Sequence, residues 1–231
     1  MASHTNITDL PDSVFEVILS LVPVKKAVAI CLLSKRWNHI RLSLPSLEFD
    51  ESNFSSIHSF LQYVDTVMRL RDDSETLKKF HLILRSICSS ENLKKINTQI
   101  NAALDSKTEH VEIYDHNACN NEIPSCIFKC NTITVLKLTG VKVTTTTPSF
   151  VDLPSLKVLH LSNVIFSNLE FVYNLLYSCP LLQDLSLKYC FAPHAVRDWI
   201  VPINEESLRN LVPAYASQYP FSLEEVIIVF N

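Results

Sequence analysis

Three residues, Asp115, His116 and Cys119, form the local group in which a nucleophile stands beside a base and a carboxylate, the set that a cysteine-dependent hydrolase uses. Cys119, Cys126 and Cys130 are close enough to suggest a metal, but a structural zinc site needs paired short spacings and a fourth ligand. Proximity in sequence does not establish geometry, and the segment DHNACNNE is typical of a solvated loop. We therefore expect no catalytic residue and no metal ligand, and the hydrolase is only a third alternative.

A single glycine, Gly140, excludes several enzyme classes. Dinucleotide-binding GxGxxG turns, phosphate-binding GxxxxGKS/T loops, GxSxG nucleophile elbows and EF-hand loops need glycine where the backbone takes a positive φ or approaches a ligand closely. The acidic doublets, such as Glu205-Glu206, are expected to be solvated, because neighbouring side chains diverge on a strand and on a helix. The sequence thus predicts a non-catalytic protein without a cofactor.

The composition predicts a globular, intracellular chain. Of 231 residues, 47% are hydrophobic and 19% are charged, a balance that forms a core. A net charge of -4 gives no general attraction for a phosphate backbone, so nucleic acid is not an expected partner. The longest apolar run, residues 27–33, is too short to span a membrane. Seven cysteines and a start that does not resemble a secretory leader favour a reducing compartment, either the cytoplasm or the nucleus.

The first fifty residues predict three short helices. Four apolar residues recur at the spacing of one helical face and are expected to point inward: Val14, Val17, Ile18 and Leu21. Pro23 ends this pattern, a second helix is expected over 24–33, and a third follows Ser34 as its N-cap. A unit of about forty residues buries little surface by itself. The sequence therefore indicates that this unit binds a partner, or that it is a helical cap that closes the core of the following repeats.

From residue 48 onward a leucine pattern repeats. The template LxxLxL recurs, and its middle positions 111, 136, 159, 185 and 211 are 23 to 26 residues apart, within the period of leucine-rich repeats. Its clear copies are Ile133-Leu136-Leu138, Leu156-Leu159-Leu161, Leu182-Leu185-Leu187 and Leu223-Val226-Ile228. Looser copies are Leu77-Phe80-Leu82, Thr108-Val111-Ile113 and the incomplete Leu208-Leu211. Each copy predicts a short strand whose leucines point inward, and stacking the copies buries a core that one copy could not bury alone.

The segments between the strands must lead the chain back. One helical return is predicted by four apolar residues that precede Pro180: Leu169, Val172, Tyr173 and Leu176. The position that holds Asn or Cys in regular repeats is filled differently in three copies: Val141, Val164 and Cys190. The repeats are therefore irregular.

Residues that alternate with the inward leucines are expected to line a concave face, which solenoids use to bind partners. Seven of them are candidates for contacts with a protein substrate: Lys137, Thr139, His160, Ser162, Asp184, Ser186 and Lys188. The alternative for any one of them is ordinary solvated strand surface.

The N-terminal unit resembles the F-box motif. Leu10-Pro11, Ile18-Leu19-Ser20, Pro23 and Leu33-Ser34-Lys35-Arg36-Trp37 match the motif in residue type and spacing, with departures at Val22 and Asn38. The remainder, including DLPSLKVLHLSNVIF and LLYSCPLLQDLSLKYC, is similar to plant F-box/leucine-rich-repeat proteins, many of which carry a C-terminal FBD module. Gln99 stands where that family commonly has tryptophan, and the sequence stops at Asn231 without a recognisable FBD segment, which indicates a truncated or divergent member.

This resemblance implies an α/β fold, with a helical F-box over 1–47, flexible over about 1–7, followed by an irregular leucine-rich-repeat solenoid over 48–231. It implies a substrate-recognition subunit of a ubiquitin ligase that binds a Skp-type adaptor and, through it, a cullin. The residues implied in adaptor binding are Leu10, Pro11, Val14, Ile18, Leu19, Val22, Pro23, Ala27, Val28, Leu33 and Trp37. The alternative is a non-catalytic interaction scaffold without a substrate of its own.

Overall fold

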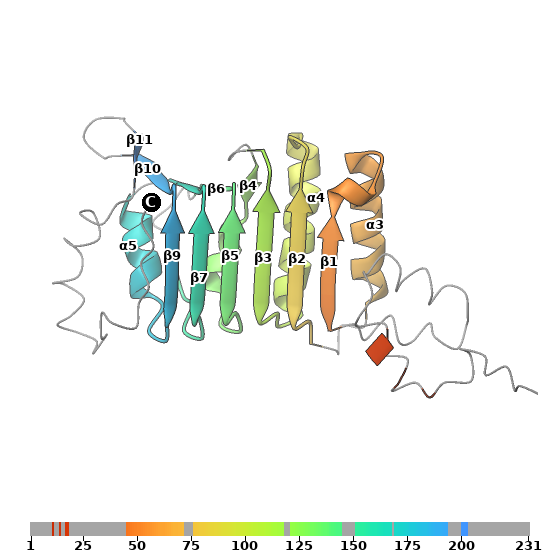
Figure 1. Cartoon of the computed structure of the whole chain (residues 1–231), viewed down its shortest axis with the longest axis horizontal. Helices are drawn as coiled ribbons and strands as arrows, with labels where there is room; N and C mark the ends of the chain where they lie inside the picture. Colours follow the sequence, from red (N-terminus) through yellow and green to blue (C-terminus); the bar gives the residue numbers. More distant parts are fainter. Residues whose placement is uncertain are drawn as a thin grey trace, which may run out of the picture.

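A computed structural model describes residues 45–71, 76–117, 121–144, 151–167, 169–193 and 200–202, together with Pro11, Val14, Val17 and Ile18. These residues form a mixed α/β fold with two largely parallel sheets, an architecture consistent with leucine-rich repeats (Figure 1). Within the described ranges, no helix has both the length and the apolar character that crossing a bilayer requires.

Six parallel strands form the larger sheet, in the order β1-β2-β3-β5-β7-β9, and lie side by side in Figure 1. They are β1 (Ser46–Asp50), β2 (Lys79–Leu84), β3 (His110–Asp115), β5 (Val135–Thr139), β7 (Val158–Ser162) and β9 (Asp184–Lys188). The middle leucines Leu136, Leu159 and Leu185 pair across β5, β7 and β9 and are buried. These strands confirm the predicted repeat register, including both complete looser copies.

Two further predicted copies, Leu208-Leu211 and Leu223-Val226-Ile228, lie outside the described residues. One strand was not among the predicted copies. In β1, Leu47 and Phe49 point inward and are buried, so the sheet begins one strand before the first recognised copy.

A second sheet of very short strands follows the carboxyl ends of the first, in the order β11-β10-β8-β6-β4. Its members are β4 (Glu122–Ile123), β6 (Lys142–Val143), β8 (Ile165–Phe166), β10 (Phe191–Pro193) and β11 (Ile200–Pro202). The pairs are parallel except for β10 with β11. A strand of two residues is too short to show an alternating pattern, so the sequence did not predict this sheet.

Helical segments connect the strands on one side of the larger sheet (Figure 1). They are the 3-10 helices η4 (Glu51–Asn53) and η5 (Ser125–Lys129), and the α-helices α3 (Ile57–Leu70), α4 (Ser90–Asp105) and α5 (Leu169–Tyr177). Ser56 and Ser89 cap α3 and α4, each accepting a hydrogen bond at 3.2 Å from the backbone N–H three residues later. Their apolar faces and the inward strand residues share one core.

Gln99, which stands where the resembling family has tryptophan, is buried between helices. Its Nε2 donates to Oδ1 of Asp65 at 3.2 Å and so links α4 to α3. A polar side chain is stable at this buried position because its amide has a hydrogen-bond acceptor.

The position of α5 confirms the predicted helical return, and two residues of the predicted stripe, Val172 and Leu176, contact the core. Phe171, Val172 and Leu175 are buried, whereas Leu176 is only half-buried. The ring of Phe171, which the predicted stripe did not include, packs edge-on against Phe128 of the preceding return with 5.1 Å between centroids. The apolar spacing alone predicted the helix but not which neighbours its face would meet.

Candidate partner-binding face

The side of the larger sheet away from the helices forms a face that we call the open face. It consists of the side chains that alternate with the buried ones, in three rows across the strands. The middle row is Glu48, His81, Glu112, Lys137, His160 and Ser186. All seven predicted substrate-face residues lie here, on β5, β7 and β9, and each is half-buried.

Two of these residues contact each other directly. Nε2 of His160 on β7 lies 2.9 Å from Oδ2 of Asp184 on β9. The pair joins neighbouring strands, since Asp184 is aligned with Val158, two residues before His160. The alternation placed both residues on one face, but only the strand order brought them together.

The centre of the open face holds a carboxylate that the sequence analysis did not select. Oε2 of Glu112 on β3 lies 3.5 Å from Nζ of Lys79 and 3.5 Å from Nε2 of His110. Partial burial would raise the pKa of Glu112, but the positive charges of neighbours such as His81, Lys79 and Lys137 outweigh it and lower that pKa. The two looser repeat copies were the signal that could have predicted these outward residues.

His110 lies beside this carboxylate on the same strand. Its pKa is lowered, first by partial burial and then by the charge of Lys79, while Glu112 acts in the opposite direction. The neighbouring His81 has its Nδ1 3.9 Å from Oε1 of Glu48 on β1. Acidic and basic groups therefore alternate across β1, β2, β3 and β5.

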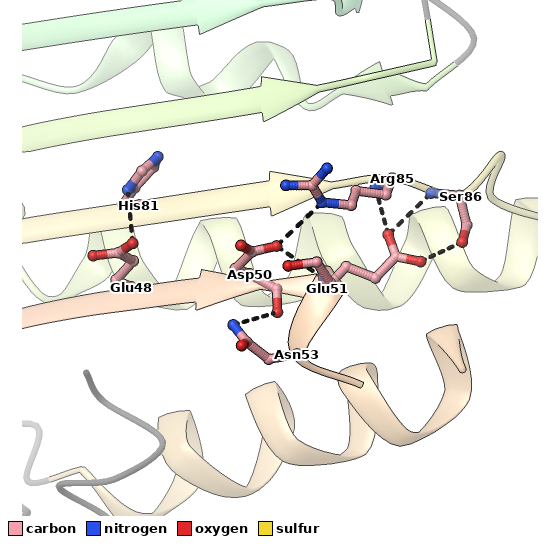
Figure 2. Close-up of polar contacts among 8 residues, drawn as sticks. Glu48, Asp50, Glu51, Asn53, His81, Arg85 and Ser86 are labelled. Carbon is pink, nitrogen blue, oxygen red and sulfur yellow. Dashed lines mark hydrogen bonds and ion pairs between the residues drawn. The ribbon is translucent and has the colours of Figure 1, made fainter. Parts of the chain in front are cut away.

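At the carboxyl end of β1, two acidic residues bind the adjacent strand end (Figure 2). Oδ1 of Asp50 lies 3.4 Å from Nε of Arg85. Burial raises the pKa of Asp50, but hydrogen bonds from Ser52 and the contact with Arg85 lower it further, so the net shift is downward.

Glu51 is the buried carboxylate of this pair, with only 6% of its surface exposed. Its Oε2 accepts hydrogen bonds from the backbone N–H groups of Arg85 at 2.5 Å and of Ser86 at 3.0 Å, and its Oε1 accepts one from the Ser86 hydroxyl (Figure 2). The carboxylate thus satisfies three donors in the turn after β2. It fixes the end of β1 to the end of β2.

Replacing Glu51 by alanine should therefore destabilise the fold by about 3 kcal/mol, because buried donors lose their acceptor and a cavity remains. Glu51→Gln keeps one carbonyl acceptor and should cost about 1 kcal/mol. The control Glu48→Ala, at an exposed position on β1, should change stability by less than about 0.5 kcal/mol. Urea unfolding followed by circular dichroism measures all three, and equal midpoints for Glu51→Ala and Glu48→Ala would contradict the structural role.

The prediction that residues 115–122 form a solvated loop is wrong for two residues. Asp115 is 2% exposed and Asn121 is 1% exposed. Oδ1 of Asp115 accepts from the backbone N–H of Asn117 at 2.9 Å, and burial raises the pKa of Asp115. Asn121 accepts from the backbone N–H of Cys88 at 3.0 Å and donates to the Ser86 carbonyl. Asn121 is stable in the interior because it satisfies backbone groups of the preceding repeat, whereas Asp115 accepts within its own turn.

Asn121 also occupies the position that precedes a short strand, as Val141, Val164 and Cys190 do. It is the residue that regular repeats place there, and the sequence analysis missed it because the insertion around 116–120 shifts it away from the leucine pattern. His116 is exposed and its ring lies tilted against that of Tyr114, with 4.7 Å between ring centroids. Cys119 lies outside the described residues.

Thiol chemistry gains no support from the described cysteines. Burial raises the pKa of Cys88 to about 11 and of Cys179 to about 12, and it also raises that of Cys126. A nucleophilic cysteine needs the opposite shift, because the thiolate is the reactive form. Over the described ranges, no three histidine, cysteine or acidic side chains are grouped as metal ligands would be.

Of the eleven residues implied in adaptor binding, three lie within the described ranges. Pro11 is exposed, Val14 is 44% exposed and Ile18 is half-buried. Val17, expected to point inward with Val14, is 60% exposed, so that expectation is wrong for both valines. An apolar stripe identifies one face of a helix but not what covers it. The other implied residues lie outside the described ranges: Leu10, Leu19, Val22, Pro23, Ala27, Val28, Leu33 and Trp37.

A parallel sheet with aligned leucines, helical returns on one side and a polar open face on the other is typical of leucine-rich-repeat proteins. The family model "FBD-associated F-box protein At5g56370, LRR repeats" matches residues 100–230. The chain therefore belongs to the leucine-rich-repeat family of FBD-associated F-box proteins.

Individual relatives agree with this assignment. The chain is 32% identical over 190 residues to "F-box/LRR-repeat protein 13" of Arabidopsis thaliana, a match that covers 80% of this chain and 41% of that protein. It is 33% identical over 183 residues to "F-box/FBD/LRR-repeat protein At4g26340" of the same plant, covering 78% of this chain and 42% of that protein. The chain thus spans about two fifths of the length of the curated relatives it matches. A comparison with solved structures gives no match.

Proposed function

We propose that this chain is the substrate-recognition subunit of a Skp-cullin-F-box ubiquitin ligase. In this proposal residues 1–47 are an F-box that binds a Skp-type adaptor and, through it, a cullin. Residues 48–231 are an irregular leucine-rich-repeat solenoid whose open face binds a protein substrate. Family membership is the observation that carries the proposal, since the matched family is named for F-box proteins.

The open face supports the substrate-binding half of the proposal. Its side chains come from six different strands, and its polar groups are aligned in rows by the parallel register. Repeat proteins use such continuous surfaces to bind partners because each repeat adds one more strand of contact residues. The proposed contacts are those of β5, β7 and β9, on the left of the sheet in Figure 1, including Lys137, His160 and Lys188.

The proposed mechanism is proximity and requires no catalytic residue in this chain. Holding a substrate close to a charged conjugating enzyme raises the effective concentration of the substrate's lysines, and the bond-making groups belong to the other subunits. Raised thiol pKa values at Cys88, Cys126 and Cys179 agree with a binding role, because none of these thiols is activated as a nucleophile.

The main alternative is a non-catalytic interaction scaffold that binds an adaptor or another protein but has no substrate of its own. Deleting the gene and measuring protein abundances separates the two functions, because only a recognition subunit has a partner whose half-life lengthens on deletion.

Adaptor binding is tested with the full chain. The double substitution Leu10→Ala with Pro11→Ala should reduce co-precipitation of a Skp-type adaptor at least about tenfold, because a few apolar anchors carry most of the energy of an interface. The matched control, Lys129→Gln with Lys142→Gln, changes two exposed lysines on η5 and β6 and should leave adaptor capture unchanged. Circular dichroism of each variant checks that the repeats remain folded.

If wild-type protein captures no adaptor, the ubiquitin-ligase proposal fails and the scaffold is the better account. If the double variant captures adaptor as well as wild type, residues 10 and 11 do not form the interface and the implied site is wrong.

A further inference from the structure

The charges of the open face are unevenly neutralised. Every carboxylate that lies on it has a basic partner within 4 Å among the described residues: Glu48 with His81, Asp50 with Arg85, Glu112 with Lys79 and His110, and Asp184 with His160. Two lysines of the same face, Lys137 and Lys188, form no ion pair with any described residue. Lys137 lies close enough to Glu112 to lower its pKa, but Lys79 and His110 make the direct contacts.

Over β5, β7 and β9, the two ammonium groups of Lys137 and Lys188 outnumber the one carboxylate, Asp184, which contacts the imidazole of His160. Hydroxyl groups lie in the same rows as the two lysines. Thr139 is aligned with Ser162, Ser162 with Lys188, and His160 with Ser186. Hydroxyl and ammonium groups together donate hydrogen bonds to an anionic group, so this area is suited to a negatively charged ligand.

The spacing of the lysines limits the shape of that ligand. Lys137 and Lys188 are separated by two strand spacings across the sheet and by two residues along the strand direction, which gives about 12 Å between their Cα atoms. In an extended peptide, residues i and i+4 lie on the same side about 13 Å apart. An extended segment can therefore bring two acidic side chains to both lysines at once.

We propose that this half of the open face binds an extended acidic protein segment in which carboxylates at positions i and i+4 pair with Lys137 and Lys188. The inference rests on the proposed substrate-recognition function and specifies the class of substrate. Ser162 lies on β7 between the two charged contacts, Thr139 and Ser186 lie on either side of the line that joins them, and these hydroxyl groups donate to the segment. The other half of the face, where acids and bases are already paired, contributes little net charge to binding.

The test uses the full chain and a fluorescein-labelled, otherwise uncharged peptide with two glutamates at i and i+4, measured by fluorescence anisotropy at low salt. Two comparison peptides carry glutamine at both positions, or glutamates at adjacent positions. Lys137→Gln with Lys188→Gln should weaken binding of the i, i+4 peptide about tenfold, since two partly exposed ion pairs are lost. The control variant Lys129→Gln with Lys142→Gln has the same net charge and should bind as wild type.

Support requires that the i, i+4 peptide binds more tightly than both comparison peptides and that only the Lys137 and Lys188 variant loses this preference. Equal binding of the three peptides, or equal loss in both variants, overturns the inference. Tighter binding of a single-stranded RNA oligonucleotide through the same two lysines would also overturn it in favour of a nucleic-acid site. Adaptor capture is measured on the same preparations, so failure of the acidic-segment inference with intact capture is distinguished from failure of the proposed function.

Discussion

Gly140→Ala is expected to destabilise the fold by about 4 kcal/mol or more, the largest effect of any single methyl group that we predict. Gly140 follows β5 and has a φ of +71°, a backbone conformation in which a side chain is strained. A Cβ at this position would lie 1.9 Å from the backbone carbonyl oxygen of Asp115, far inside van der Waals contact. Neither backbone segment can move away easily. Asp115 is the last residue of β3, and the Gly140 N–H donates to the Ser162 carbonyl at 2.9 Å.

The next two repeats provide the control for this prediction. Asn163 and Tyr189 occupy the equivalent position after β7 and β9, with φ values of 56° and 51°. They show that positive φ alone is tolerated there, so the close approach to Asp115 is what requires glycine. Tyr189→Ala keeps a Cβ in this conformation and should change the free energy of unfolding by less than about 1 kcal/mol. Equal denaturation midpoints for Gly140→Ala and wild type would show that the carbonyl can move away.

Leu159→Ala is expected to cost about 2 to 5 kcal/mol, from lost burial and from the cavity left behind. Leu159 is fully buried in β7, and its partners on either side are Leu136 and Leu185. The cavity would lie between two repeats, where the fixed strand spacing prevents the neighbours from closing it. Thermal unfolding of the purified chain measures the loss.

The control for Leu159 is Lys157→Ala, two residues earlier at an exposed position, which should shift stability by less than about 0.5 kcal/mol. Similar small effects for the two substitutions would contradict the inward register. Similar large effects would mean that Lys157 has a packing role that its exposure does not indicate.

Local patterns were sufficient to predict the inward positions of the strands. Leu136, Leu159 and Leu185 could be assigned from sequence because side chains alternate across a strand with a period of two, whatever lies next to it. The same rule correctly placed Lys137, His160 and Lys188 on the opposite face. The helical return before Pro180 was also predictable, since apolar spacing and proline act within one element.

Contacts between elements were not predictable in this way. The apolar stripe of α5 did not indicate that Phe171 would meet Phe128, and the polar segment after β3 did not indicate that Asp115 and Asn121 would be buried. Both outcomes depend on partners in other repeats. The short second sheet has the same origin, because each of its strands is defined by its neighbours rather than by its own sequence.

The sequence by itself determined which residues of this protein form strands and which of their side chains point inward, because alternation is a property of the local backbone. Only the tertiary structure decided which outward residues become neighbours, because strand order and register depend on the lengths and packing of the returns between them. The pairing of His160 with Asp184 and of Glu112 with Lys79 is a product of that register. The same register leaves Lys137 and Lys188 without carboxylate partners among the described residues, since the acids nearest to them already contact other bases.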